Sequence, residues 1–326
     1  MGKKLSISND NKQHNSVLFF FLFIAAIAAV AIIANLLTGQ AFLHILNIKS
    51  IISSLIYPIF IAWGICFLFA CGYFDLSLGG ILILASFGAV AAGNIWGYPG
   101  VILGGMISGT CLVFFNFFVF AFTRIPSWIS SVGLALVYES IAIFLRQNFA
   151  TRQYVDAELN AGYRAIGNMP VNLILLGAGF VIVYILYNRT SVGLNIRAVG
   201  GNESVSRALG VNTRRTILYV GLICGLLMGV AAMIQQSYNL RTTVLPAMTS
   251  IVLIFKPLAI ALLAQVLQKR INIIIAVPFC ALIIYGVFNL MTFFHIQSGT
   301  LQDVFLCIFI VAFGIGGQRG VREVVK

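Results

Sequence analysis

Three charged residues stand in or beside long apolar stretches of this sequence, where a charge is unusual. Asp75 follows the second long apolar stretch, Glu139 lies within the fifth and Lys256 within the eighth. A charge at membrane depth is costly, so we expect these residues to face the interior of a helix bundle or a wet cavity, where they could serve ion coupling. Each has a structural alternative. Asp75 would cap the next helix, and Lys256 would either pair with Glu139 or extend to the outer interface.

The residue types used for metal binding and nucleophilic catalysis do not gather anywhere in the sequence. The six cysteines all fall in apolar runs without metal-ligand spacing, and His14, His44 and His295 are isolated. The sequence also has no Gly-x-x-x-x-Gly-Lys-Ser/Thr phosphate loop. We therefore expect no catalytic residue, no metal site, no cofactor and no ATP hydrolysis by this chain, which disfavours a membrane-embedded enzyme.

The composition indicates what kind of secondary structure carries Asp75, Glu139 and Lys256. Of the 326 residues, 60% are hydrophobic and only 9% are charged, which a water-soluble globule could not bury. Runs of about 20 apolar residues cross a bilayer as helices. We therefore predict an all-α, polytopic membrane protein with about ten transmembrane helices, near residues 17–38, 51–71, 77–96, 99–121, 127–145, 170–187, 216–236, 248–267, 271–292 and 301–317.

Small residues four apart predict how some of these helices pack, because they let two helices approach closely without a hydrophobic driving force. Gly105 and Gly109 form such a pattern in the fourth run. Gly221, Gly225 and Gly229 repeat it in the seventh.

The formal net charge of +12 reports topology rather than a nucleic-acid partner. With a cytoplasmic N-terminus, ten spans place most basic residues inside the cell, as the positive-inside rule requires. We predict a cytoplasmic tail at 1–16, a membrane domain at 17–317 with a cytoplasmic loop at 188–215, and a second cytoplasmic tail at 318–326. The basic residues left outside are Lys49, Arg146, Arg152, Arg164 and Arg241.

A polar and basic interval at 197–215 separates two long apolar runs and carries helix start and stop signals. Asn202 is a favourable N-cap, Glu203 places negative charge in the first turn, and Gly210 stands where a glycine would end the helix. The interval is either an ordinary solvated loop or a docking element with a short helix over Glu203–Leu209. The apolar face of that helix would consist of Val205, Ala208 and Leu209.

The stretch Ala198-Val-Gly-Gly-Asn-Glu-Ser-Val-Ser-Arg-Ala-Leu-Gly-Val211 resembles the cytoplasmic signature of ABC-transporter permeases of the ribose and monosaccharide type. In that family the segment is a coupling helix that rests in a groove of the ATP-hydrolysing subunit. The sequence departs from the signature at Val205, where the family usually has alanine. The resemblance implies ATPase coupling by Gly200, Gly201, Asn202, Glu203, Val205, Arg207, Ala208, Leu209 and Gly210.

A second stretch, Ala70-Cys-Gly-Tyr-Phe-Asp-Leu-Ser-Leu-Gly-Gly80, resembles the Gly-Ile-Asp-Leu-Ser-x-Gly motif of the same family. Tyr73 and Phe74 replace its usual small and aliphatic residues. The family's glycine-rich stretch before the penultimate helix is missing, because residues 264–272 contain no glycine. This departure favours a specialised member that pairs with a different permease over one that pairs with its own copy.

The resemblance implies the permease subunit of an ABC importer in the bacterial inner membrane, working by alternating access. Partner ATP-binding subunits would supply energy, and an extracytoplasmic solute-binding protein would supply specificity. Residues 146–168 are either a solvated loop or the docking surface for that protein. The solute would be ribose-like or another small polar molecule; alternatives are a nucleoside permease or an ion-coupled secondary transporter. Candidate residues for the translocation path are Asp75, Ser77, Asn116, Glu139, Gln235, Asn239 and Asn289, each of which could instead bond helix to helix.

Overall fold

The structure, a computed structural model, describes residues 24–25, 28–123, 125–149, 157–242, 248–296, 299 and 301–322. Within these ranges the chain divides into two compact units. Unit 1 comprises residues 1–52 and 262–326, and unit 2 comprises residues 53–261. The predicted tail at 1–16, the start of the first predicted span, and Arg152 lie outside the described residues.

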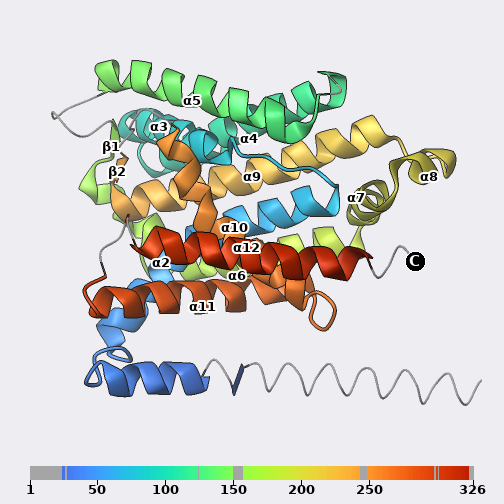
Figure 1. The fold of residues 1–326 in the computed structure, drawn as a ribbon. Helices are drawn as coiled ribbons and strands as arrows, with labels where there is room; N and C mark the ends of the chain where they lie inside the picture. The colour runs from blue at the N-terminus through green and yellow to red at the C-terminus, as the bar shows by residue number, and fades with distance from the viewer. Residues whose placement is uncertain are drawn as a thin grey trace, which may run out of the picture. The chain divides into compact units, whose positions relative to one another are not determined.

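Helices account for nearly all regular structure in the described residues (Figure 1). The two strands are two residues long and pair antiparallel, with Ala157 opposite Thr242 and Glu158 opposite Arg241. In chain order the elements are α2 (Ile45–Ala70), α3 (Leu78–Trp96), α4 (Tyr98–Thr123), α5 (Ser127–Phe149), β1 (Ala157–Glu158), η1 (Ala161–Gly167), α6 (Val171–Arg189), α7 (Ser191–Gly201), α8 (Glu203–Ala208), α9 (Thr213–Asn239), β2 (Arg241–Thr242), η2 (Thr249–Ile251), α10 (Val252–Leu267), α11 (Ile273–Phe293) and α12 (Leu301–Arg322).

Eight helices of the described residues are long and apolar enough to cross a membrane, which confirms the predicted all-α, polytopic class. They correspond in order to the second through ninth predicted spans. The first and tenth predicted spans contain shorter apolar helices, Ala28–Leu37 and Leu301–Ile315. The count of ten and the cytoplasmic position of both termini stay predictions.

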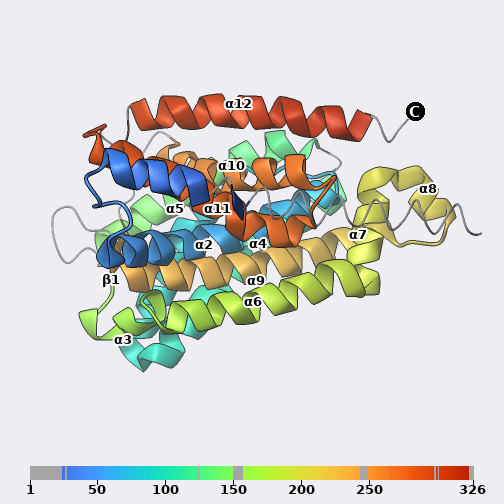
Figure 2. The same ribbon diagram turned by 90° about the horizontal axis from the view of Figure 1, so that it is seen from below.

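Unit 2 is built around α4, which packs against α3 on one side and α9 on another (Figures 1 and 2). Glycines bring the backbones together at both contacts. A Cβ on Gly104 would lie 2.4 Å from the carbonyl oxygen of Gly88 on α3. A Cβ on Gly109 would lie 2.7 Å from Cα of Gly229 on α9. The two glycine patterns seen in the sequence therefore face each other across the α4–α9 contact, as small residues in membrane helices do.

The two ends of unit 2 differ in character (Figures 1 and 2). Helices α7 and α8 form a corner at one end, beside the start of α9. The β1–β2 pair and η1 lie at the other end, where α9 finishes. There an ion pair of 3.1 Å joins Glu158 on β1 to Arg241 on β2, so it adds to the pairing of the two strands.

Unit 1 contains helix Ala28–Leu37, the start of α2, α11 and α12. Asn47 on α2 and Asn289 on α11 exchange amide hydrogen bonds of 3.0 Å in both directions. The rings of Phe42 and Phe293 lie 6.4 Å apart beside this pair. A reciprocal amide pair satisfies both side chains within an apolar setting, which is the common use of asparagine between membrane helices.

We predict that Gly109→Ala destabilises the protein while Gly177→Ala does not. The new methyl at position 109 meets the Gly229 backbone, so α4 and α9 must separate. This overpacking should lower the free energy of unfolding by about 1–3 kcal/mol. Gly177 on α6 is the matched control, because a Cβ there meets nothing within 4 Å. Apparent melting temperatures in detergent would measure both, and equal values would contradict the glycine contact.

Candidate functional site

Helix α8 forms where the sequence predicts it, and ends at Ala208, one residue before the predicted boundary. The Asn202 side-chain oxygen accepts the backbone N–H of Val205 at 3.1 Å and the Ser204 hydroxyl at 2.7 Å. Leu209 is the C-cap, and Gly210 follows with φ of +85°, a left-handed conformation that glycine adopts without strain. The predicted N-cap and terminating glycine are therefore confirmed.

The apolar face of α8 is exposed in the described structure. Val205 is 51% exposed and Leu209 is 78% exposed, whereas Ser206 on the opposite side is 3% exposed. Ala208 is exposed too. A helix of six residues has no core of its own, so this face can become buried only against something else.

Charged side chains fasten α8 to itself and to α9. Arg207 donates to the Glu203 carboxylate at 2.5 Å, an i, i+4 pair, and its Nε donates to the Thr213 hydroxyl at 3.3 Å. Both charged side chains of the pair are at least half exposed, so the pair adds only about 0.3–0.5 kcal/mol. The bond from Arg207 to Thr213 joins α8 to the first turn of α9.

Helix α7 occupies residues that the sequence analysis treated as loop. The Thr190 hydroxyl accepts the N–H of Gly193 at 3.2 Å and begins the helix. Gly193, Ile196 and Val199 form its buried face. The Arg197 guanidinium lies 5.1 Å above the ring of Tyr187 on α6, a cation–π contact between the two helices. The threonine cap and the spacing of the buried residues are the sequence signals that were overlooked.

A buried polar cluster, which we call the polar core, lies where α3, α4 and α5 meet. The Asp75 carboxylate accepts the backbone N–H of Ser77 at 2.8 Å and the Ser77 hydroxyl at 2.6 Å. Its other oxygen accepts the Asn116 amide at 3.0 Å. Asn116 also donates to the Ser77 hydroxyl and accepts the Tyr138 hydroxyl at 2.5 Å. All four side chains are at most 4% exposed.

The polar core brings together three predicted path residues and adds Tyr138, which sequence reasoning missed. Asp75 accepts the backbone N–H of Ser77, the N-cap residue that precedes α3, so it holds the start of that helix from outside it. Burial raises the pKa of the Asp75 carboxyl, and the hydrogen bonds from Ser77 and Asn116 oppose that rise. Because every member bonds to another, the cluster fixes the geometry of three helices at once.

Glu139, next to Tyr138 on α5, holds the segment before α10. Its carboxylate oxygens accept the N–H of Met248 at 2.8 Å, the N–H of Ser250 at 3.2 Å and the Ser250 hydroxyl at 2.6 Å. Gly79 on α3 closes the junction, because a Cβ there would lie 1.9 Å from the Ser250 carbonyl oxygen. Glu139 thus serves as a cap for η2, and its proposed pairing with Lys256 stays a prediction.

The remaining predicted path residues are not members of the polar core. Gln235 on α9 is 9% exposed, and its Oε1 has no hydrogen-bond partner among the described residues. Asn239 is exposed at the end of α9. Asn289 belongs to unit 1, where it pairs with Asn47. The role of all seven in a translocation path stays a prediction.

The interval 264–272 forms a tight turn between α10 and α11 although it contains no glycine. Arg270 and Ile271 donate backbone N–H groups to the Leu267 carbonyl, and Asn272 then caps α11 by accepting the N–H of Ile274 at 3.0 Å. An asparagine cap thus begins α11 directly after a tight turn.

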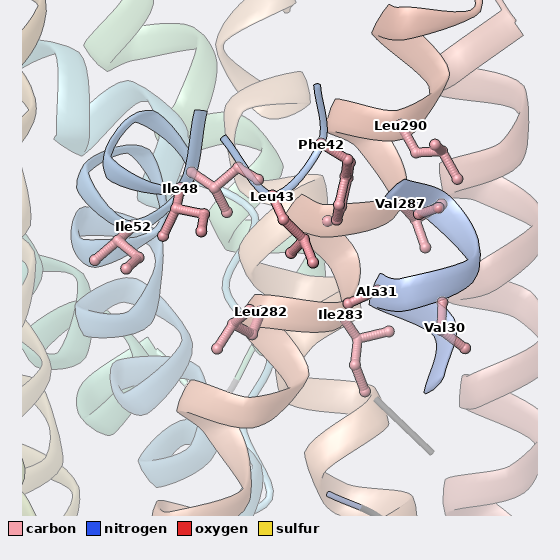
Figure 3. Close-up of a pocket in the computed structure, with 13 residues that line it drawn as sticks. Val30, Ala31, Phe42, Leu43, Ile48, Ile52, Leu282, Ile283, Val287 and Leu290 are labelled. Atoms are coloured by element: carbon pink, nitrogen blue, oxygen red, sulfur yellow. The ribbon is translucent and has the colours of Figure 1, made fainter. Parts of the chain in front are cut away.

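Unit 1 contains a cavity of about 470 Å³ between helix Ala28–Leu37, α2 and α11 (Figure 3). Side chains such as Val30, Phe42, Ile52, Leu282 and Val287 point into it (Figure 3). No lining residue has a polar side chain. A hydroxylated solute would lose its bonds to water there without replacement, so this cavity does not suit one.

Residues 47–314 match the family model described as branched-chain amino acid transport system / permease component. The L-arabinose transport system permease protein AraH of Escherichia coli (strain K12) is 26% identical over 68% of this chain and 67% of its own length. The ribose import permease protein RbsC of Bacillus subtilis (strain 168) is 26% identical over 64% of this chain and 65% of its own length. The D-allose transport system permease protein AlsC of Escherichia coli (strain K12) is 25% identical over 71% of this chain and 72% of its own length. No solved structure matches.

We predict that Asn116→Ala destabilises the protein. The change removes the amide that joins Asp75, Ser77 and Tyr138, leaving buried polar groups unpaired. The free energy of unfolding should fall by about 1–3 kcal/mol. Asn94→Ala on exposed α3 surface is the matched control, because its amide makes one long contact of 3.3 Å. Melting in detergent at neutral pH measures both, and an Asn116 variant as stable as the Asn94 variant would show that the polar core is not structural.

Proposed function

The chain belongs to the family described as branched-chain amino acid transport system / permease component, and from this premise we propose that it is the membrane-spanning permease subunit of an ATP-driven importer for a monosaccharide. The exposed apolar face of α8 carries the proposal. This face stands at one end of unit 2 on a helix held by its own cap and by Arg207. A separate ATP-binding subunit with an apolar groove is the partner it fits.

In the proposed complex, ATP hydrolysis and transport are carried out by different subunits. It has no phosphate loop, so ATP must be bound and hydrolysed by that partner. Closure of two ATPase subunits on ATP would carry α8 with them and change the packing of the helices attached to it. Alternating access then follows if the helix bundle has two discrete arrangements, since packed interfaces switch rather than deform continuously.

A monosaccharide is the solute class that the relatives favour. Three similar permeases are named for L-arabinose, ribose and D-allose, which are all small polyols with a ring oxygen. Such solutes need a few hydrogen-bonding groups along a path that they must also leave. Polar residues on otherwise apolar helices, Gln235 and Asn239 among them, would supply these groups.

Two further partners complete the proposed complex in the bacterial inner membrane. A solute-binding protein would dock at the end of unit 2 opposite α8, where η1 is anchored by the Tyr98 hydroxyl, which donates to the Gly162 carbonyl at 2.6 Å. Import through a path between subunits also requires a second permease. The glycine-free turn at 264–272 favours a different permease chain over a second copy of this one.

We expect an ATP-binding subunit to copurify with this chain and to be lost in Leu209→Glu. A new carboxylate at a 78% exposed apolar position would have to be desolvated when the face is buried. Leu194→Glu on α7 is the matched control, because Leu194 is also exposed, at 61%, but lies outside the predicted docking residues. The experiment is affinity purification from membranes in mild detergent, through a C-terminal tag, with bound subunits identified by mass spectrometry.

A Gly201→Arg, Glu203→Arg double variant tests the same surface by charge reversal and should also lose the ATPase. Retention of the ATPase by both sets of docking variants would refute the docking site. Absence of any ATPase from the wild type would refute the proposed class and favour an ion-coupled transporter. The other proteins recovered would show whether the second permease is this chain or another.

We further predict that disrupting the gene of this chain abolishes uptake of at least one labelled monosaccharide. The panel should contain L-arabinose, D-ribose and D-allose, with uridine and adenosine as the nucleoside alternative. Uptake should return with the wild-type chain and not with Leu209→Glu. Loss of nucleoside uptake alone would overturn the sugar assignment, and uptake that survives ATP depletion but collapses with the ion gradient would overturn ATP drive.

A further inference from the structure

The last turn of α7 touches the chain between α2 and α3 through backbone atoms. We call residues Cys71–Ser77 the α2–α3 break. A Cβ on Gly200 would lie 2.0 Å from the Ala70 carbonyl oxygen and 2.9 Å from the Cys71 carbonyl carbon. Gly72, with φ of +80°, lies directly opposite, since a Cβ there would be 3.8 Å from Cα of Gly200. No side chain stands between the two segments to absorb a displacement.

The first residue of α8 is also within electrostatic reach of the break. Burial raises the pKa of the Cys71 thiol to about 12, and the Glu203 carboxylate adds to the rise. Burial likewise raises the pKa of Tyr73 to about 12, again with a contribution from Glu203. The backbone contact at Gly200 places the α7–α8 corner against the break, and the Glu203 carboxylate adds a negative charge beside it.

The other side of the break is bound to α4 and α5. The N–H of Phe74 donates to the Ser127 hydroxyl at 3.2 Å, and the N–H of Leu76 donates to the Ser131 hydroxyl at 3.1 Å. The Tyr73 ring stacks on Phe120 of α4, with ring centres 6.1 Å apart. Asp75 joins the polar core. The break thus contacts the α7–α8 corner on one side and two membrane helices, α4 and α5, on the other.

We propose that the α2–α3 break is the joint that carries movement of α8 to the polar core, and that Gly200 is the positioning residue of this joint. The inference rests on the proposed function, because α8 must be moved by an ATPase subunit. Close-packed backbone transmits a displacement because it has no loose side chain to yield. The alternative route through Arg207 and Thr213 depends on an exposed, flexible side chain at 3.3 Å and should transmit less.

Cys71 reports the state of the joint. It is 3% exposed, lies under Gly200 and belongs to the break itself. Reactivity of a thiol requires access and ionisation, so this buried cysteine should react slowly in the resting state. The experiment uses the permease purified with its ATPase subunit and compares N-ethylmaleimide labelling of Cys71 without nucleotide and after trapping with MgATP and vanadate. Peptide mass spectrometry separates Cys71 from the other cysteines.

In the wild type we expect trapping to change Cys71 labelling several-fold. Cys224, fully buried within α9, should stay protected and is the internal control against general loosening. In Gly200→Ala the methyl forces α7 and the break apart, so the nucleotide dependence of Cys71 labelling should be lost. Gly177→Ala should keep the wild-type dependence, since a Cβ there is unobstructed.

The outcomes separate this inference from the proposed function. If no ATPase copurifies with the wild type, the proposed function fails. If the ATPase is present but trapping leaves Cys71 labelling unchanged, or changes Cys71 and Cys224 together, the joint is refuted. The comparison of wild-type labelling with and without trapping requires no variant, so it tests the joint even if Gly200→Ala fails to accumulate. If wild-type labelling responds and Gly200→Ala responds equally, the role of Gly200 is refuted.

Discussion

A polar group within the hydrocarbon core has no water to bond, and this constraint orders much of the described structure. Each buried polar side chain must find a partner in the chain or carry an energetic penalty. Serines within helices meet the requirement locally, as Ser86 does by donating to the Leu82 carbonyl at 2.9 Å. Asp75 and Glu139 cannot do so. Each therefore accepts backbone N–H groups from a non-helical segment. Asp75 accepts the N–H of Ser77, and Glu139 accepts those of Met248 and Ser250.

Satisfying a carboxylate in this way also sets where a helix can start. Met248 and Ser250 present backbone N–H groups just before α10, and Glu139 accepts both, so η2 begins at a fixed place relative to α5. Gly79 then allows α3 to touch the Ser250 carbonyl. Replacing Glu139 by an apolar residue would leave the N–H groups of Met248 and Ser250 without this acceptor. The Glu139 carboxylate thus fixes the backbone that leads into α10 relative to α5.

Features with local signals could be predicted from the sequence, and features formed between distant segments could not. Helix α8 was predicted because its cap Asn202 and its terminating Gly210 lie within nine residues of sequence and act on their own neighbours. The membrane helices were predicted for the same reason, since length and apolarity are properties of each segment alone. The all-α class and the candidate coupling helix can therefore be predicted from sequence, whereas the contact of Gly200 on α7 with Ala70 cannot.

The polar core shows where such prediction ends. Asp75, Ser77 and Asn116 could be singled out as polar residues in apolar surroundings, but Tyr138 looks like any aromatic residue of a membrane helix. Its bond to Asn116 joins residues 22 positions apart, and the Asn47–Asn289 pair joins residues 242 positions apart. The Thr190 cap and the spacing of the buried residues of α7 are local signals, but the helices that bury this face, α6 and α9, cannot be identified from the sequence. These features depend on which helices become neighbours, and a single sequence does not contain that choice in readable form.

The hydrogen bonds also separate four of the seven predicted path residues by the free energy that binding a solute hydroxyl would cost. Asp75, Ser77 and Asn116 are fully occupied with one another, so a sugar hydroxyl could bind them only by breaking a buried bond worth about 0.5–1.5 kcal/mol or more. Gln235 differs, because its Oε1 is buried without a partner among the described residues. A hydroxyl donating to that oxygen would remove a penalty instead of adding one. On this argument the predicted path follows α9 near Gln235, and the polar core positions the helices beside it.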